Sequence, residues 1–119
     1  MALDIETAGA VRVITLEGKV LTEVAQDLKP QFDAYAAATP GPTLIDMSGV
    51  RYVSSYLVGV LVELNSRLSA KGFAMHFAGM DSRHRLVLKI SGLEGLFEFH
   101  ESRAQGIAAL TAGRAATSP

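Results

Sequence analysis

Two adjacent serines, Ser54 and Ser55, begin a segment with strong helical periodicity and carry the clearest potential for regulated chemistry. In one interpretation a serine hydroxyl caps the helix by accepting a hydrogen bond from a backbone N–H of the first turn. In the other, a serine there is phosphorylated, since free N–H groups and the helix dipole favour an anion at that end. A phosphate, with a charge of about −2, would then act on any protein that touches this surface.

The remaining polar residues give no pattern typical of a metal site or a catalytic site. The histidines are His76, His84 and His100, none at H-x-x-x-H spacing, and the chain has no cysteine, so we expect no metal site. Asp46 ends a predicted strand without a second carboxylate, a general base or a phosphate-binding glycine loop beside it. We expect it to hydrogen-bond the turn at Ser48. The sequence therefore predicts no catalytic residues, no cofactor and no enzyme, and a small enzyme ranks as the third hypothesis.

Composition narrows the class of protein further. The 119 residues are 49% hydrophobic and 19% charged, which suits a folded domain, and the net charge of −1 argues against nucleic-acid binding. The first residues contain Asp4 and Glu6 and no apolar core of a signal peptide. The longest apolar stretch, Tyr56 to Val62, is far shorter than the ~20 residues of a membrane span. We expect a cytoplasmic protein without membrane insertion.

Apolar alternation and turn residues predict the element order ββαβαβαβα. Strands are expected at residues 2–6, 11–17, 43–47, 73–78 and 96–99, with a turn at Ala8–Gly9, a break at Ser48–Gly49 and a connector at 50–53. Helices are expected at residues 22–38, kinked at Pro30, and at 54–70, 82–90 and 102–112. The alternation implies right-handed crossovers and an α/β fold, with a mixed, mostly parallel sheet of four to five strands and about four helices. We expect one domain over residues 1–112 and a disordered tail over 113–119.

The helix that follows the two serines has an apolar stripe at Leu57, Leu61, Leu64 and Leu68, which must pack on the sheet. The opposite side carries Tyr56 and Gly59, and glycine is unfavourable inside a helix. Gly59 could let a second protein approach closely. Alternatively, it packs under a neighbouring loop, with Tyr56 over it. The pattern leaves both interpretations open.

The segment LIDMSGVRYVSS at residues 44–55, with Gly59-Val60-Leu61 after it, resembles the STAS domain of bacterial anti-sigma factor antagonists. These residues are similar to the family's strand, its S-G-V turn, its switch serine and its second helix. A second stretch, LVLKISGL at 86–93 and LFEF at 96–99, also fits, as does Gly18. The resemblance extends from residue 3 to about residue 110 and implies the STAS fold.

This resemblance implies a partner switch that regulates transcription. The unphosphorylated protein binds an anti-sigma factor of the serine-kinase type, the kinase phosphorylates one serine, and a phosphoserine phosphatase reverses the step. The corresponding serine here is Ser55, with Ser54 as the second choice. The implied partner-binding residues are Ser54, Tyr56, Gly59, Val62, Glu63 and Ser66.

Two features depart from the family pattern. Tyr56 and Leu57 stand where a small residue and a glycine usually follow the switch serine, and Leu21 replaces a common aspartate. The alternative function is that of a constitutive STAS subunit with Ser55 as a simple helix cap. Such a subunit would be a scaffold in a stress-signalling complex or an accessory to a lipid-transport ATPase.

Overall fold

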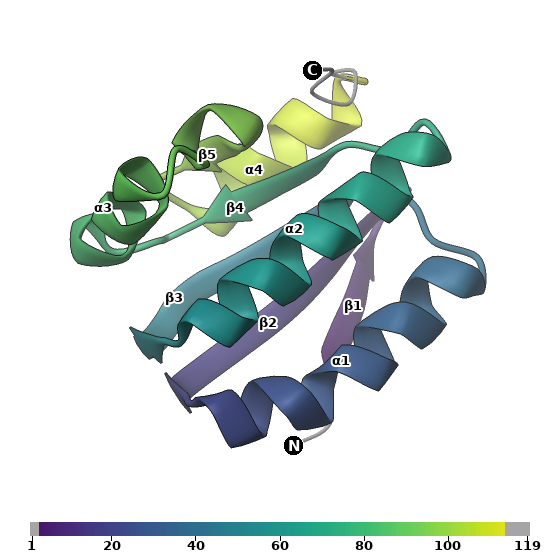
Figure 1. Cartoon of the computed structure of the whole chain (residues 1–119). Helices are drawn as coiled ribbons and strands as arrows, with labels where there is room; N and C mark the ends of the chain where they lie inside the picture. Colours follow the sequence, from purple (N-terminus) through teal and green to yellow (C-terminus); the bar gives the residue numbers. More distant parts are fainter. Residues whose placement is uncertain (1–2, 114–119) are drawn as a thin grey trace.

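A five-stranded sheet forms the centre of the computed structural model, which describes residues 3–113 (Figure 1). Its strand order follows the sequence, β1-β2-β3-β4-β5. β1 and β2 form an antiparallel hairpin, and all later neighbours are parallel. The strands are β1 Asp4–Ala8, β2 Val11–Val20, β3 Thr43–Val53, β4 Met75–Ala78 and β5 Glu98–His100. The predicted α/β fold with a mixed, mostly parallel sheet is confirmed.

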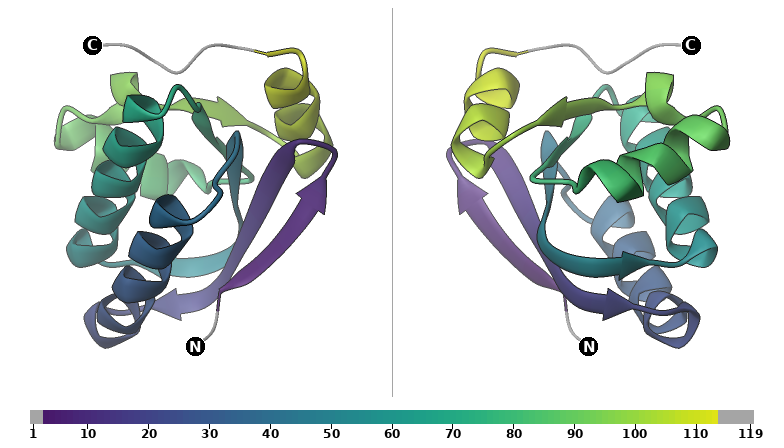
Figure 2. Two further views of the ribbon diagram at one scale, coloured as in Figure 1. Left: turned by 90° about the vertical axis from the view of Figure 1, so that its right-hand side faces the viewer. Right: turned by 90° about the vertical axis from the view of Figure 1, so that its left-hand side faces the viewer.

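Four α-helices and one 3-10 turn connect and cover these strands. They are α1 Thr22–Ala37, α2 Ser55–Ala70, α3 Ser82–Ile90, the 3-10 turn η1 Glu94–Leu96 and α4 Arg103–Thr111. α1, α2 and α3 connect successive parallel strands that lie side by side in the order of the sequence. Because such connections are right-handed, all three helices lie on the same face of the sheet. The last helix, α4, crosses to the opposite face (Figure 2). Each face therefore has its own packing layer.

The larger apolar cluster lies between the sheet and α1, α2 and α3. The predicted stripe of α2 is confirmed as part of it, since all four of its leucines are buried there: Leu57, Leu61, Leu64 and Leu68. A smaller cluster on the other face joins β2, β3 and β4 to Leu110 of α4. In α4, a Cβ on Gly106 would lie 2.5 Å from Cδ1 of Leu44, so glycine lets this helix approach the sheet closely.

The predicted end of the third strand at Met47 is wrong. β3 continues through Ser48–Gly49 and includes the expected connector at Val50–Val53. The pairing register with β2 shifts at this point, so the residues that resemble a turn form a β-bulge. The bulge extends β3 to the start of α2, which fixes where that helix begins.

Smaller differences concern the ends of elements. The hairpin turn lies at Gly9–Ala10, with Gly9 at a φ of 62°. β2 runs three residues beyond Glu17, β4 begins at Met75, and α1 ends at Ala37, with Pro30 inside it as expected. The expected last strand is displaced, because Leu96 belongs to η1 and β5 starts at Glu98. Of the predicted tail, residues 114–119 lie outside the described residues.

Candidate functional site

Ser54 forms the junction between β3 and α2. Its backbone N–H donates to the carbonyl of Val20 at 3.2 Å, and its hydroxyl oxygen accepts from the N–H of Leu57 at 3.1 Å. The side chain is only 3% exposed. Ser54 is therefore the N-cap of α2, and the alternative in which Ser55 is the cap is wrong.

Ser55 is the first residue of α2 and is exposed. In the first turn, Leu57 and Val58 donate their N–H groups to the side chain and the carbonyl of Ser54. Within residues 3–113, the N–H groups of Ser55 and Tyr56 have no such acceptor. Two free donors and the positive end of the helix dipole thus lie beside the Ser55 hydroxyl.

The outer side of α2 carries two adjacent stripes of residues, each with helical spacing. One contains Ser55 followed by small or half-exposed residues: Gly59, Val62 and Ser66. The other runs along the side nearest α1: Tyr56, Val60, Glu63 and Arg67. Most of the predicted partner-binding residues therefore lie on one continuous helix surface, whereas Ser54 lies beneath it.

A shallow hollow of about 320 Å³ lies where these stripes meet α1. It is lined by Lys29, Tyr56, Gly59, Val60 and Glu63. A Cβ built on Gly59 would meet no atom within 4 Å, so the interpretation that Gly59 packs under a loop is wrong. The surface at Gly59 is open to an approaching molecule.

Four charged side chains connect α1 and α2 beside the hollow. Lys29 pairs with Asp33 at 3.0 Å and with Glu63 at 3.7 Å, and Arg67 pairs with the same two carboxylates at 3.5 and 2.9 Å. The hydrogen bond to Asp33 raises the pKa of Lys29 above its usual value of 10.5. Single exposed pairs contribute little to stability, so the network mainly fixes these side chains and the charges they present.

Exposed apolar side chains surround the start of α2. Leu21 is 43% exposed, Tyr52 47% and Tyr56 36%. Leu21 follows Val20, whose carbonyl binds the Ser54 N–H, and Tyr52 precedes Ser54 by two residues in β3. Because the three lie near the same end of α2, they offer apolar area that a partner protein can cover. Tyr52 is not among the residues predicted from the sequence, because a connector does not indicate which way its side chains point.

A polar network lies on the opposite face of the sheet. Asp46 accepts from the N–H and hydroxyl of Ser48 at 3.0 and 2.7 Å, as predicted, and also from Arg103 of α4 at 2.9 and 3.0 Å. Arg103 also donates to Thr15 at 2.9 Å. Burial raises the pKa of Asp46, but the hydrogen bonds from Ser48 and Arg103 outweigh it and hold the pKa below 3.8.

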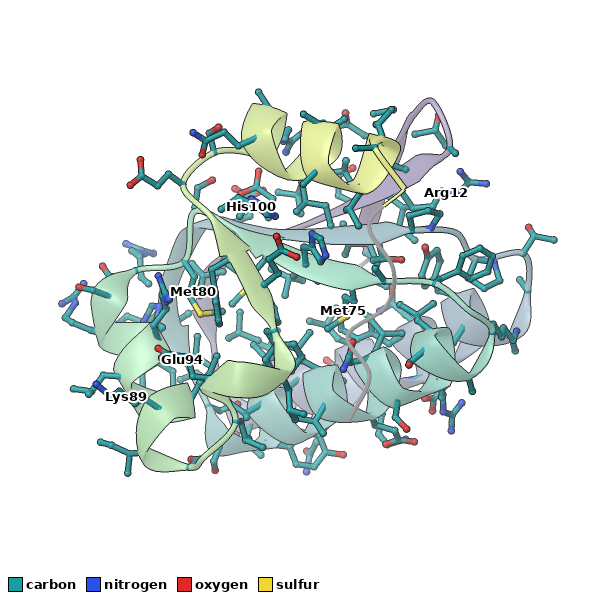
Figure 3. The ribbon with its side chains drawn as sticks, turned by 90° about the horizontal axis from the view of Figure 1, so that it is seen from above. Arg12, Met75, Met80, Lys89, Glu94 and His100 are labelled. Carbon is teal, nitrogen blue, oxygen red and sulfur yellow. The ribbon has the colours of Figure 1, made fainter. Side chains whose placement is uncertain are left out.

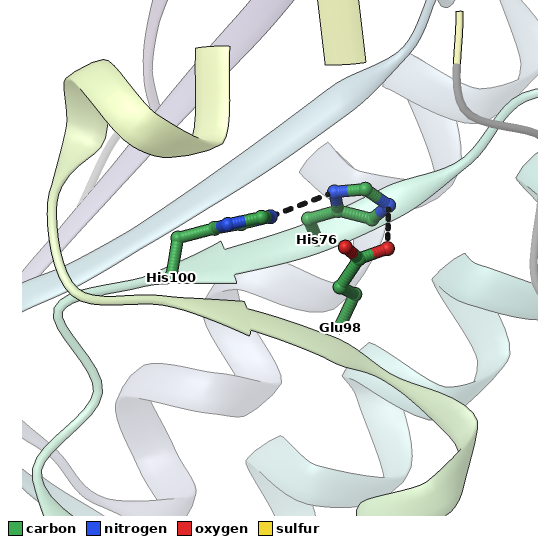
Figure 4. A group of neighbouring side chains, drawn as sticks. All are labelled: His76, Glu98 and His100. Atoms are coloured by element: carbon green, nitrogen blue, oxygen red, sulfur yellow. Dashed lines mark hydrogen bonds and ion pairs between the residues drawn. The ribbon is translucent and has the colours of Figure 1, made fainter. Parts of the chain in front are cut away.

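A second polar group on that face joins β4 and β5. Nδ1 of His76 lies 3.1 Å from Nε2 of His100, and Nε2 of His76 lies 3.2 Å from Oε2 of Glu98 (Figure 4). Figure 3 shows His100 on the α4 side of the sheet and Met75 on the α2 side. No spacing in the sequence indicates this group, because it arises from the pairing of His76 with Glu98 between neighbouring strands.

Within residues 3–113, no helix is both long and apolar enough to cross a membrane. Comparison with protein families finds that the model of the STAS domain matches residues 2–106. No individual curated protein matches the sequence significantly.

Solved structures share the fold at low sequence identity. An anti-sigma-factor antagonist (STAS) domain protein from Planctomyces limnophilus is 17% identical, with a TM-score of 0.82 and coverage of 93% of this chain and 99% of that one. An anti-sigma factor antagonist from Mycobacterium paratuberculosis is 19% identical, with a TM-score of 0.82 and coverage of 92% and 93%. The phosphorylated Bacillus cell fate determinant SpoIIAA is 16% identical, with a TM-score of 0.74 and coverage of 92% and 99%.

Proposed function

Because this chain belongs to the STAS domain family, we propose that it is an anti-sigma factor antagonist whose binding is controlled by phosphorylation of Ser55. It binds an anti-sigma factor of the serine-kinase type in the cytoplasm and thereby releases a sigma factor. The kinase transfers the γ-phosphoryl group of ATP to the Ser55 hydroxyl, and a phosphoserine phosphatase removes it by hydrolysis.

The observation that carries this proposal is the difference between the two serines. The Ser55 hydroxyl is exposed at the first position of α2, while the Ser54 hydroxyl is buried and occupied as the helix cap. A kinase can reach the first without unfolding the helix, whereas reaching the second would break the cap. Ser54, the second choice from sequence, is therefore the weaker candidate.

The proposed partner surface combines apolar contact area with an open helix. Tyr56, Leu21 and Tyr52 supply exposed apolar groups, and Gly59 lets a partner backbone approach α2. The hollow between α1 and α2 continues from Tyr56 to Glu63. Such an interface tolerates a serine hydroxyl at its edge. A dianionic phosphate at the same place would have to lose its hydration or find a cationic partner, so it would weaken binding.

Phosphorylation is expected to act on the interface and to leave the fold intact. The two free N–H groups at the start of α2 and the helix dipole favour a negative charge at Ser55. We therefore expect Ser55→Asp to keep the melting temperature of the wild type or to raise it slightly. Ser66→Asp, on the same exposed stripe but away from the helix end, is the matched control and should show no such gain.

The decisive experiment uses the full chain, ATP and each anti-sigma kinase of the source organism, followed by intact-mass analysis and peptide mapping. We expect one phosphate, on Ser55, which is lost in Ser55→Ala and kept in Ser66→Ala. Phosphate on another residue, or none with any kinase, would exclude Ser55 as the switch.

Binding measurements then separate the switch from the alternative function. For the partner kinase, Ser55→Asp should weaken affinity by at least about tenfold, and Ser66→Asp should leave it near the wild-type value. Full-affinity binding by Ser55→Asp would contradict gating and favour the constitutive scaffold. Stable capture by a lipid-transport ATPase, with no kinase binding, would favour the accessory-subunit role.

A further inference from the structure

We propose that His76 and His100, held in place by Glu98, form a binding site for a divalent transition-metal ion of the Zn²⁺ type. The three side chains come from the two neighbouring parallel strands β4 and β5, and their ligand atoms all lie within 4.8 Å of one another. The site lies on the α4 side of the sheet, whereas the proposed switch lies at the start of α2 on the other side (Figure 3). It is thus independent of the proposed function.

Strand geometry brings the three groups together. Met75 and Phe77 belong to the apolar cluster beneath α2, so the alternation of side chains along β4 directs His76 to the opposite face. In the parallel register His76 pairs with Glu98, and His100 lies two residues further along β5 on the same face. A one-residue change of register would separate the three side chains.

The two imidazole nitrogens lie almost as far apart as two nitrogen ligands of one zinc ion. Nδ1 of His76 and Nε2 of His100 are 3.1 Å apart. Two ligands of a tetrahedral zinc ion, each about 2.0–2.1 Å from the metal, lie about 3.3 Å apart. To admit the ion, the nitrogens must separate slightly, and the rings must turn so that their lone pairs meet at the metal in place of the hydrogen bond that now joins them. Each nitrogen then directs a lone pair at the metal, and His100 carries its remaining proton on Nδ1.

Glu98 has the position of an outer-shell carboxylate. Its Oε2 lies 3.2 Å from Nε2 of His76, the nitrogen on the far side of the ring from His100 (Figure 4). A carboxylate that accepts the second N–H of a metal-binding histidine fixes the tautomer and orientation of the ring and strengthens it as a ligand. Glu98 is accordingly a positioning residue, and His76 and His100 are the ligands.

Burial and ligand type select the class of ion. His76 is fully buried, while the side chain of Glu98 is 34% exposed on the edge strand and His100 is half-buried, so an ion can enter from the β5 edge. Imidazole ligands suit zinc, copper and nickel, whereas magnesium and calcium prefer oxygen. Asp46 is already bound to Arg103, so it is not counted among the ligands.

Metal binding would strengthen the pairing of the shortest strand of the sheet. β5 has three residues and pairs with β4 through only three positions. An ion held by one histidine from each strand cross-links the two strands, and it stabilises the folded state because the unfolded chain lacks the site.

The test is a titration of the full-length, tag-free protein with ZnCl₂ by calorimetry after treatment with EDTA and dialysis. We expect one saturable site with a dissociation constant at or below about 10 μM, and no binding of MgCl₂. Saturating zinc should raise the melting temperature by roughly 5 °C or more. With CoCl₂, the site should show visible absorption from coordinated cobalt.

Matched variants assign the site. His100→Gln removes a ligand and should weaken zinc binding at least about 100-fold, and Glu98→Gln should weaken it roughly tenfold. His84→Gln makes the same substitution in the third histidine, which lies in α3 outside the group, and should bind as the wild type does. If His100→Gln does not fold, Glu98→Gln and the cobalt spectrum decide.

Three outcomes would overturn the proposal. These are no saturable zinc binding below about 100 μM, binding that persists in both His100→Gln and Glu98→Gln, or binding that depends on His84. In each case the group would be a hydrogen-bond chain that satisfies a buried imidazole. None of these outcomes affects the kinase experiments, so failure here is distinguishable from failure of the proposed function.

Discussion

The two faces of the sheet are packed in different ways. The face beneath α1, α2 and α3 is covered by one continuous apolar cluster that contains the leucine stripe of α2. The face beneath α4 has a smaller apolar cluster and two polar groups, one around Asp46 and Arg103 and one around His76 and His100. The first face gains stability mainly from apolar area, and the second depends on the geometry of polar contacts.

Because of this difference, the surface proposed to bind a partner lies apart from the polar contacts that stabilise the α4 face. The proposed switch serine, Ser55, and the hollow lie on the outer side of α2 and α1, whose inner side is anchored by apolar packing. Such an anchor tolerates changes of charge on the exposed side, which a phosphorylation switch requires. The α4 face holds the buried carboxylate of Asp46 with its partner Arg103, and the two interacting histidines. Substitutions there should affect stability before they affect the partner surface.

The largest effect should come from the apolar face. Leu64→Ala removes a fully packed side chain from the cluster and should lower the free energy of unfolding by about 2–5 kcal/mol, as measured by urea denaturation. Ile107→Ala, at a partly buried site on the α4 face, is the control and should cost less than half as much. Equal losses would contradict the difference between the faces.

The next effect tests the polar network. Asp46→Asn keeps the shape of the side chain but removes the charge that binds Arg103, and should cost about 1–3 kcal/mol at pH 7. Asp27→Asn, at an exposed aspartate of α1, should have little effect and serves as the control. A loss of the same size in both variants would contradict the assignment.

The lowered pKa of Asp46 also predicts how its contribution to stability changes with pH. Because the pKa of Asp46 in the folded protein lies below its ordinary value of 3.8, its contribution is complete above about pH 4. It is lost as the pH falls through the folded pKa. The difference in free energy of unfolding between wild type and Asp46→Asn should therefore shrink below pH 4 and stay constant between pH 5 and 7. Urea denaturation across this range checks it, and a difference that grows on acidification would contradict it.

Two glycines inside helices, Gly106 in α4 and Gly59 in α2, test the same comparison through smaller changes in the free energy of unfolding. Gly106→Ala places a Cβ 2.5 Å from Cδ1 of Leu44, so the leucine must shift or α4 must move away from β3. The strain should exceed the gain in helix propensity and lower stability by about 1 kcal/mol. Adding Leu44→Val should recover part of this loss in thermal denaturation; no recovery would show that the strain lies elsewhere.

Gly59→Ala should act in the opposite direction. No atom lies within 4 Å of the added Cβ, so the variant should gain about 0.5–1 kcal/mol from helix propensity alone. It should also weaken kinase binding if a partner uses the open surface at Gly59. Destabilisation by this substitution would show that Gly59 is packed, against the structure described above.

The sequence predicted most of the apolar face for a physical reason. Helical periodicity is local, so the leucines of α2 identify its buried side, and Ser54 and Asp81 occur where helices need N-caps. The prediction failed at Ser48–Gly49, because a bulge and a turn use the same residue types and only pairing with β2 distinguishes them. For the candidate site, the residues of α2 could be named from the sequence, but which serine is exposed could not.

By itself, then, the sequence determined the element order, the buried side of α2 and the region of the proposed switch, since each depends on neighbours within a few residues. Only the tertiary structure decided the polar groups of the α4 face. Asp46 and Arg103 are 57 residues apart, and His76 and His100 are 24 apart. Strand register and helix docking bring such residues together, and no local pattern encodes either one.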